Sequence, residues 1–314
     1  MSKKSGEKLC VIMTGFSCNN NCVVCSVRPF AKKNRDKSFS EIEQMMVSSR
    51  EKEISSVEFT GGEPTIRKDI IKLISRAKEL GFREIALSTN ARYFSYRPFL
   101  DAAVSAGLNR VTTTIDGHNA KLHDLITRTP GSFDETKAGI IELIKSGVET
   151  SANTVLCSLN APFLREVGET ISSFGVEVWG ILDLIPDGNI ADVYPKFSVP
   201  LSEIRESLHR AFSAVSDMQF LELFDFSYCV IPEEIRNSPK TIIFDAFKRS
   251  TILKQVGYDP QRFSESGGFY EDIHKERLSG CINCLNNKEC AGIWKEHMAA
   301  HGDDERFTKD NFIS

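Results

Sequence analysis

The sequence predicts an α/β protein built around a parallel sheet, and three observations support this prediction. Short runs rich in Val, Ile, Leu and Thr alternate with amphipathic stretches through the first two thirds of the 314-residue chain. Each pair of segments occupies about 25–35 residues, the size of a βα unit. The runs are almost continuously apolar, as in parallel strands with both faces buried. We therefore expect a repeating βα architecture.

The repeat contains six predicted strands, at residues 9–14, 56–60, 84–89, 110–115, 150–156 and 176–184. Five helices are predicted between them, at residues 40–53, 67–80, 97–106, 133–146 and 162–174. Ser40, followed three residues later by Glu43, has the spacing of a capping box at the start of the first helix. The last four helices are each followed by a glycine suited to the left-handed position that ends many helices, namely Gly81, Gly107, Gly147 and Gly175.

The alternation of strand and helix patterns ends at a strong turn signal, Pro186 to Asn189. We place a domain boundary there, with the βα region at residues 1–190 and a smaller Cys-rich region at residues 191–314. The second region contains a predicted helix at 201–218 and a strand-like stretch at 220–230.

The composition excludes some classes of protein. The chain has 39 Lys and Arg against 43 Asp and Glu, a net charge of −4, so it lacks the basic surface of a nucleic-acid binder. Its longest apolar runs fall far short of the roughly 20 residues that cross a bilayer. The apolar stretch after the N-terminal lysines is also too short for a signal peptide. We predict a cytoplasmic protein with no membrane partner and no nucleic-acid partner.

Six of the nine cysteines fall into two tight groups, a distribution that favours metal sites over disulfides. The first group, Cys18, Cys22 and Cys25, follows the first predicted strand. Soft thiolate ligands favour zinc, copper(I) or iron–sulfur clusters. A closed zinc site needs a fourth ligand, and no further Cys or His follows nearby, whereas a cluster with one open iron accommodates three. Zinc remains the alternative.

Two motifs carry a family resemblance. The spacing CxxxCxxC after the first strand resembles the signature of radical S-adenosylmethionine (radical SAM) enzymes, in which it holds a 4Fe-4S cluster. Gly61, Gly62, Glu63 and Pro64 follow the second strand and resemble the family's GGEP segment, which receives the methionine amino group. Glycines allow close backbone approach, and a carboxylate accepts hydrogen bonds from an ammonium group. The resemblance implies a partial (β/α)6 TIM-like barrel with a small C-terminal Cys-rich auxiliary-cluster domain.

Further positions match the family's cofactor-binding residues at or beyond the carboxyl ends of the strands, the functional edge of such a barrel. The resemblance assigns to the cofactor S-adenosyl-L-methionine (AdoMet) the residues Thr89, Asn90, Thr114, Asp116, Arg128 and Asn153. Arg128 would pair with the methionine carboxylate and Asn153 would lie near the adenine. The alternatives are that Asn90 and Asp116 only form turns and that Arg128 is a surface charge.

The resemblance implies reductive cleavage of AdoMet to methionine and a 5′-deoxyadenosyl radical, which removes a hydrogen atom from the substrate. Such an enzyme needs an electron donor, and we expect a flavodoxin or a ferredoxin. Cys157, just past the fifth predicted strand, is a candidate hydrogen-atom donor to a substrate radical.

The second cysteine group, Cys281, Cys284 and Cys290, resembles the auxiliary-cluster region called SPASM or, with one cluster, twitch. A fuller SPASM pattern has another cysteine where this chain has Trp294. We therefore expect one auxiliary 4Fe-4S cluster with Cys229 as its fourth ligand. The alternatives are a closed structural zinc site, a Cys229 buried in the core, and His297 or His301 as the fourth ligand.

The resemblance thus implies a radical SAM enzyme of the oxidoreductase, epimerase or maturase type. Only 17 residues precede Cys18, so we expect no fused leader-peptide domain, and we favour a small polar substrate such as a sugar, nucleoside or cofactor precursor. The alternatives are a maturase of a ribosomal peptide and a non-enzymatic, zinc-stapled binding module.

Overall fold

A computed structural model describes residues 9–27, 34–186, 189–244, 275–284, 286, 290 and 292–302. Its main sheet is parallel throughout and follows the order of the sequence. The eight strands are β1 (Leu9–Gly15), β2 (Ser56–Gly61), β3 (Glu84–Thr89), β4 (Arg110–Thr114), β5 (Glu149–Val155), β6 (Val178–Leu182), β7 (Phe220–Phe224) and β8 (Thr241–Phe244). The predicted α/β class is confirmed, with two strands more than the six expected.

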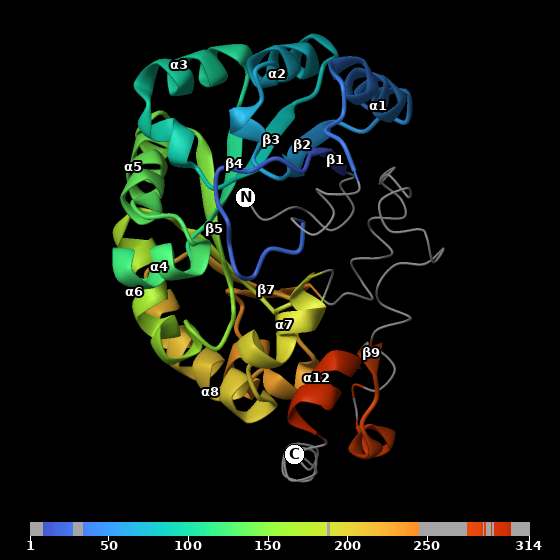
Figure 1. Cartoon of the computed structure of the whole chain (residues 1–314), viewed down its shortest axis with the longest axis vertical. Helices are drawn as coiled ribbons and strands as arrows, with labels where there is room; N and C mark the ends of the chain where they lie inside the picture. Colours follow the sequence, from blue (N-terminus) through green and yellow to red (C-terminus); the bar gives the residue numbers. More distant parts are fainter. Residues whose placement is uncertain are drawn as a thin grey trace.

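Helices connect the strands and cover the outer face of the sheet, which curves as Figure 1 shows. They are α1 (Phe39–Glu51), α2 (Ile70–Glu79), α3 (Arg97–Ala106), α4 (Ala120–Thr127), α5 (Ser132–Lys145), α6 (Leu164–Ser173), α7 (Asn189–Phe197), α8 (Leu201–Phe212) and α9 (Glu233–Arg236). Among the described strands β1 pairs only with β2 and β8 only with β7, so the barrel is partial rather than closed.

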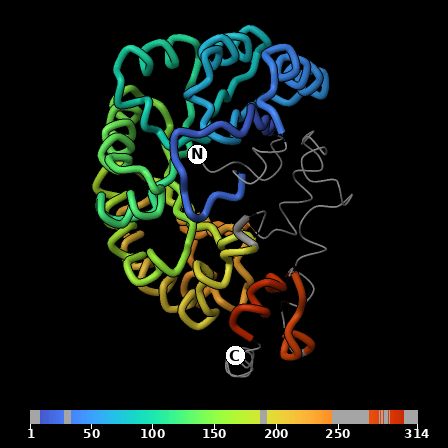
Figure 2. Tube along the Cα trace, in the orientation of Figure 1, coloured from blue at the N-terminus to red at the C-terminus, as the bar shows by residue number. Residues whose placement is uncertain are grey.

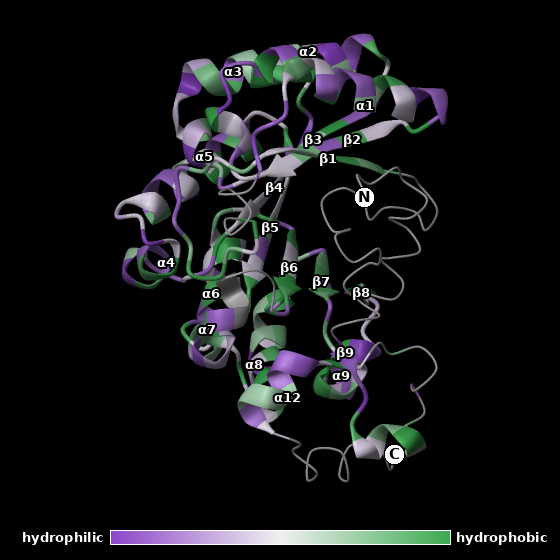
Figure 3. Ribbon diagram, turned by 45° about the vertical axis from the view of Figure 1, so that its right-hand side comes forward, coloured by the Kyte–Doolittle hydropathy of each residue, from purple (hydrophilic) through white to green (hydrophobic). Residues whose placement is uncertain are grey.

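Alternating burial distinguishes the two faces of the sheet. Side chains such as Ile12, Phe59 and Leu223 are fully buried on the outer face, where they pack in one continuous core. The helices over this face carry hydrophilic and hydrophobic residues side by side (Figure 3), as amphipathic covering helices do. The opposite, concave face carries half-buried polar residues such as Thr112, Thr114 and Asn153. The concave face is therefore the one that can receive ligands.

The predicted capping box lies two residues later in the sequence than the observed one. Ser38, not Ser40, caps α1, and its hydroxyl accepts a hydrogen bond from the backbone N–H of Glu41. The Glu41 carboxylate in turn accepts from the Ser38 N–H at 2.8 Å. Both serines have a glutamate three residues on, so the spacing alone could not distinguish them. The four glycines predicted to end helices all have the expected positive φ.

The chain after residue 190 contributes to the same sheet through β7 and β8. A separate two-stranded antiparallel sheet joins β9 (Lys275–Glu276) to β10 (Ile293–Trp294), and α12 (Lys295–His301) follows it. This segment, coloured orange to red in Figure 2, lies beside the strand ends at the β7 side. The division at residue 190 stays a prediction. No helix in the described parts of the chain is both long and apolar enough to cross a membrane.

Candidate functional site

The first cysteine group lies in the loop after β1, and the start of that loop is joined to the turn after β2. The Gly62 N–H donates to the Gly15 carbonyl at 2.8 Å, and the Glu63 N–H donates to the Ser17 carbonyl at 2.7 Å. Asp36 holds the loop from the other side, since its carboxylate accepts from the Phe16 N–H at 2.7 Å. The two predicted motifs are therefore in direct backbone contact.

The middle of the loop is held by residues that follow β3. The Asn90 side-chain amide donates to Asn19 Oδ1 at 2.7 Å. The Arg92 guanidinium, in the short helix η3 (Arg92–Ser95), donates to the Asn19 carbonyl at 2.9 Å and to Asn20 Oδ1 at 2.7 Å. Glu135 fixes that guanidinium with an ion pair of 2.6 Å. The side chain of Arg92 thus cross-links the cysteine loop to α5.

The far end of the loop rests on α4, a helix the sequence analysis did not predict. The Asn21 N–H donates to the Thr127 carbonyl and the Val23 N–H to the Ile126 carbonyl, each at 2.9 Å. These carbonyls belong to the last turn of α4, where backbone acceptors have no partner within the helix. The loop supplies those partners, so α4 and the loop stabilise each other.

The three thiols of the loop lie close enough to influence one another. Burial raises the pKa of Cys18 to about 11, although the Asn20 N–H lowers it. Burial also raises the pKa of Cys22, with further increases from Asp116, Cys25 and Cys18. Neighbouring thiolates repel, so this set is stable in its ligating form only beside a positive centre. Within the described residues, no three Cys, His, Asp or Glu side chains form a group that could hold a metal ion.

Glu63 joins the ends of β2 and β3. Its Oε1 accepts from the Thr65 N–H at 2.9 Å and from the Thr65 and Thr89 hydroxyls, each at 2.6 Å. Its Oε2 accepts from the Asn90 N–H at 2.7 Å. Burial raises the pKa of this carboxyl group, while these donors favour the charged form. Oε1 has therefore used its acceptor capacity, and Oε2 is the atom with capacity for a further donor.

Asp116 lies just past β4 and is almost fully buried. Its carboxylate accepts from the Val155 N–H at 2.9 Å, and burial raises its pKa to about 7. The Asn160 side chain donates to the Asp116 carbonyl at 3.1 Å. Asp116 also raises the pKa of Cys22, so the structure brings this predicted residue to the cysteine loop.

The other predicted residues have different surroundings. Thr114 and Asn153 are register partners on the concave face of β4 and β5. Arg128 caps α4 in the left-handed conformation, and its side chain is exposed. Cys157 is fully buried in an apolar cluster with Val24, and burial raises its pKa to about 12. The roles assigned to these residues stay predictions.

The second cysteine group gathers where the loop between β9 and β10 meets the segment after β7. Cys229 lies in η6 (Tyr228–Val230) and Cys281 in η8 (Ser279–Asn283). Burial raises the pKa of Cys229 to about 12, with further increases from Cys290, Cys281 and Cys284. These four half-buried thiols are therefore neighbours.

The two histidines considered as alternative ligands contact α7 and the residue that follows it. The His301 ring lies 2.8 Å from the Ser198 hydroxyl, just past α7. The buried His297 ring packs edge-on against Tyr194 in α7.

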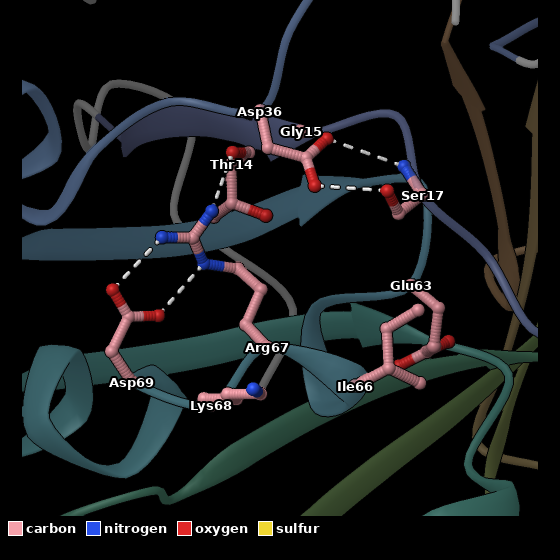
Figure 4. Close-up of a pocket in the computed structure, with 9 residues that line it drawn as sticks. All are labelled: Thr14, Gly15, Ser17, Asp36, Glu63, Ile66, Arg67, Lys68 and Asp69. Carbon is pink, nitrogen blue, oxygen red and sulfur yellow. Dashed lines mark hydrogen bonds and ion pairs between the residues drawn. The ribbon is translucent and has the colours of Figure 1, made fainter.

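A cavity of about 420 Å³ opens beside the turn after β2. Figure 4 shows Arg67 between the Asp69 carboxylate, an ion pair of 3.0 Å, and the Thr14 carbonyl, while Asp36 bonds to Ser17. Sequence reasoning missed both Asp36 and Arg67, because neither belongs to a motif. The cavity is lined by Thr14, Gly15, Ser17, Asp36, Glu63, Ile66, Arg67, Lys68 and Asp69.

Comparison with known families favours the iron–sulfur interpretation of the first cysteine group over the zinc site. Residues 12–160, which include the cysteine loop and the GGEP turn, match the radical SAM superfamily model. Residues 12–160 form a radical SAM domain. A domain of this family implies a 4Fe-4S cluster and AdoMet as cofactors, and three mutually interacting thiols in one loop are the soft donor set that such a cluster takes.

Two curated relatives show similarity confined to part of their length. An AdoMet-dependent heme synthase from Oleidesulfovibrio alaskensis is 34% identical over 135 residues, covering 43% of this chain and 34% of the relative. A probable GTP 3′,8-cyclase from Methanothermobacter thermautotrophicus is 27% identical over 168 residues, covering 53% of this chain and 50% of the relative. The matched region thus spans a third to a half of these relatives.

Two solved structures share the fold. Streptococcus suis SuiB bound to the precursor peptide SuiA aligns with a TM-score of 0.62 at 16% identity, covering 98% of this chain and 76% of that one. AdoMet-bound anSMEcpe aligns with a TM-score of 0.51 at 19% identity, covering 66% of this chain and 60% of that one. At these identities the likeness concerns the fold alone.

Proposed function

We propose that this protein is an enzyme that generates a 5′-deoxyadenosyl radical from AdoMet at a 4Fe-4S cluster held by Cys18, Cys22 and Cys25, and that the radical takes a hydrogen atom from a small polar substrate. One observation carries the proposal: the cysteine loop is hydrogen-bonded directly to the GGEP turn through Gly62 and Glu63. A cofactor that bridges the two motifs needs them at a fixed spacing, and these bonds fix it.

The chain's own groups then have definite tasks. The backbone of the turn after β2 can approach a methionine amino group closely, and Glu63 Oε2 can accept from it. Asp116 lies buried beside the loop, where a carboxylate can accept from ribose hydroxyls. Arg92 and Asn90 hold the loop itself, so they position the thiols without being ligands.

We further propose that Cys229, Cys281, Cys284 and Cys290 hold a second, auxiliary 4Fe-4S cluster. Their mutual proximity supports a shared centre, and four thiolates also satisfy a closed zinc site. Metal analysis distinguishes the two. Iron and sulfide for two clusters in the wild type, with one cluster lost in Cys229→Ala, supports the auxiliary cluster. Stoichiometric zinc in the wild type, or full retention of iron in Cys229→Ala, contradicts it.

The substrate class of the proposal is a sugar, nucleoside or cofactor precursor. The two relatives bear the names of enzymes for heme and for GTP, neither of which is a peptide, and this supports the choice over a peptide. A flavodoxin or a ferredoxin would supply the electron.

The test is formation of 5′-deoxyadenosine from AdoMet by anaerobically reconstituted protein with a strong reductant. We expect product from the wild type and only background from Cys22→Ala. The matched control is Cys10→Ser, which changes a buried thiol of β1 that bonds to Ser49 and lies outside the loop. Equal product from wild type and Cys22→Ala would refute the proposal. A colourless wild type containing only zinc would favour the binding module.

A further inference from the structure

We propose that a polar clasp holds together the two chain segments that carry the second cysteine group, with Lys275, Ser227 and Trp294 as its positioning residues. The clasp keeps the four thiols neighbours whether or not they bind a metal. The inference rests on the proposed function, because it concerns the auxiliary centre proposed above. It adds the protein groups that assemble this centre.

The thiols come from two segments that are far apart in the sequence. Cys229 follows β7, which belongs to the barrel sheet, whereas Cys281, Cys284 and Cys290 lie between β9 and β10. The small sheet of β9 and β10 pairs with none of the described barrel strands. Side-chain contacts therefore have to place it beside Cys229.

Lys275, in β9, makes the central contact of the clasp. Its ammonium group donates to the Asp225 carbonyl at 2.8 Å and lies 4.4 Å from the centre of the Trp294 ring. The lysine is only 8% exposed. A buried ammonium group is stable only with polar or aromatic partners. The partners of Lys275 on the barrel and on β10 therefore fix where β9 lies.

Asp225 offers its carbonyl to Lys275 from a strained backbone conformation. It is the first residue after β7, it is buried, and its φ of +67° lies in the left-handed region that favours glycine. Its N–H donates to the Phe244 carbonyl at 2.9 Å, so β8 holds the strained residue in place. Strain of this kind persists only where the surrounding structure imposes it, and it is frequent at functional sites.

Two further bonds complete the clasp. The Ser227 hydroxyl donates to the Gly292 carbonyl, which joins the segment that leads to Cys229 to the start of β10. The Trp294 indole N–H donates to the Asp183 carboxylate at 3.0 Å, just past β6. Both donor residues are buried, so water does not readily replace either partner.

The clasp does not depend on the thiols, because its three bonds all end on oxygen atoms, two of carbonyls and one of a carboxylate. Next to it, the Gly292 N–H donates to Cys290 Sγ at 3.4 Å, and Arg205 on α8 donates to the Cys229 carbonyl at 3.0 Å. Metal sites often have to order their ligand segments on binding, and that cost lowers affinity. Here other contacts join the segments, so metal binding has to adjust only the thiols.

The first experiment tests the clasp in the reduced, chelator-treated full chain. Dibromobimane bridges two neighbouring thiols, and mass spectrometry of the digested protein identifies the bridged cysteines. We expect Cys229 to be bridged to Cys281, Cys284 or Cys290 at least about tenfold faster in the folded chain than in the urea-denatured chain, because the clasp raises the local thiol concentration. Equal rates would overturn the inference.

The second experiment measures hydrogen exchange in the same metal-free chain and tests the positioning residues. Lys275→Met keeps the apolar stem and removes the ammonium group, and Ser227→Ala removes one hydroxyl. In peptides that contain β9 or β10 we expect exchange to rise at least about tenfold in Lys275→Met and about fivefold in Ser227→Ala, for the loss of a charged and a neutral hydrogen bond. Peptides from β2 to β5 should keep their wild-type rates. The matched control, Lys295→Met at an exposed lysine of α12, should change neither region.

Unchanged exchange of β9 and β10 in both variants would overturn the inference. An equal rise along the whole chain in Ser227→Ala would also overturn it, because the residue would then stabilise the fold in general. If Lys275→Met does not fold, the Ser227→Ala result decides. Neither measurement involves iron or AdoMet, so failure here would leave 5′-deoxyadenosine formation intact. Zinc in the second centre would refute the auxiliary cluster and leave the clasp standing.

Discussion

Replacement of Gly62 by alanine tests whether the contact between the two motifs holds the site together. A Cβ atom at this position would lie 2.1 Å from the Ser17 carbonyl oxygen and 2.6 Å from the Phe16 carbonyl carbon. Both are backbone atoms, so no side-chain rotation relieves the clash. The turn after β2 must therefore separate from the cysteine loop by roughly 1 Å to restore ordinary van der Waals spacing.

That separation has a cost that can be estimated. It lengthens the Gly62 N–H bond to Gly15 and the Glu63 N–H bond to Ser17, now 2.8 and 2.7 Å. Two such bonds contribute about 1 kcal/mol each, and residual strain from overpacking adds about 1–3 kcal/mol. We expect a destabilisation of about 3–5 kcal/mol. Cys18 follows Ser17 directly, so iron occupancy of the first cluster should fall as well.

The assays are the thermal midpoint and the iron content of anaerobically reconstituted protein. The control is Gly147→Ala, where the left-handed φ of +76° imposes backbone strain but a Cβ meets no atom within 4 Å. Its backbone strain should destabilise the fold by about 1–2 kcal/mol and so lower the thermal midpoint, while the iron content stays at the wild-type value. If Gly62→Ala retains both its midpoint and its iron at wild-type values, the contact does not organise the site.

Three further changes test other parts of the structure. Burial raises the pKa of Asp183 from 3.8 to about 7, although the nearby Lys275 lowers it. Between these two pH values the folded protein holds more protons than the unfolded chain. Its free energy of unfolding therefore falls as the pH rises, by at most about 1.4 kcal/mol per pH unit. Melting at successive pH values should show a steeper fall in the wild type than in Asp183→Asn, which keeps the contribution of Asp116, whose pKa burial also raises to about 7. Parallel profiles would contradict the assignment to Asp183. Glu63→Gln should lower the melting temperature less than Glu63→Ala, because the amide oxygen can still accept the three donors at Oε1; a larger loss in the glutamine variant would count against these bonds. Arg92→Ala should reduce iron incorporation, whereas Arg97→Ala, whose exposed guanidinium pairs with Asp101 on α3, should not; equal iron in both would show that Arg92 does not hold the loop.

The repeating part of the fold could be predicted from local pattern. The first five strands begin and end within a residue or so of their predicted bounds, since an apolar run and its following turn fix a strand locally. Strands β7 and β8 were not assigned to the sheet. The four-residue β8 is too short for periodicity to register, and its place depends on pairing with β7, which is a tertiary contact.

The candidate site likewise contains residues that local sequence motifs reveal and residues that only the fold brings into place. The cysteine spacing and the GGEP turn are local motifs, so the sequence reveals them. Asp36, Arg67 and Arg92 are ordinary charged residues in sequence, and each bonds to a backbone atom at least 20 residues away along the chain. Nothing local distinguishes them from surface charges, because their function depends on which loops the sheet brings together.

Topology explains why cysteines at opposite ends of the sequence lie beyond the same edge of the sheet. Cys18 follows β1 by three residues and Cys229 follows β7 by five, and both strands belong to one parallel sheet. The carboxyl ends of parallel strands share an edge, so both thiol groups must gather at that edge whatever their separation in sequence.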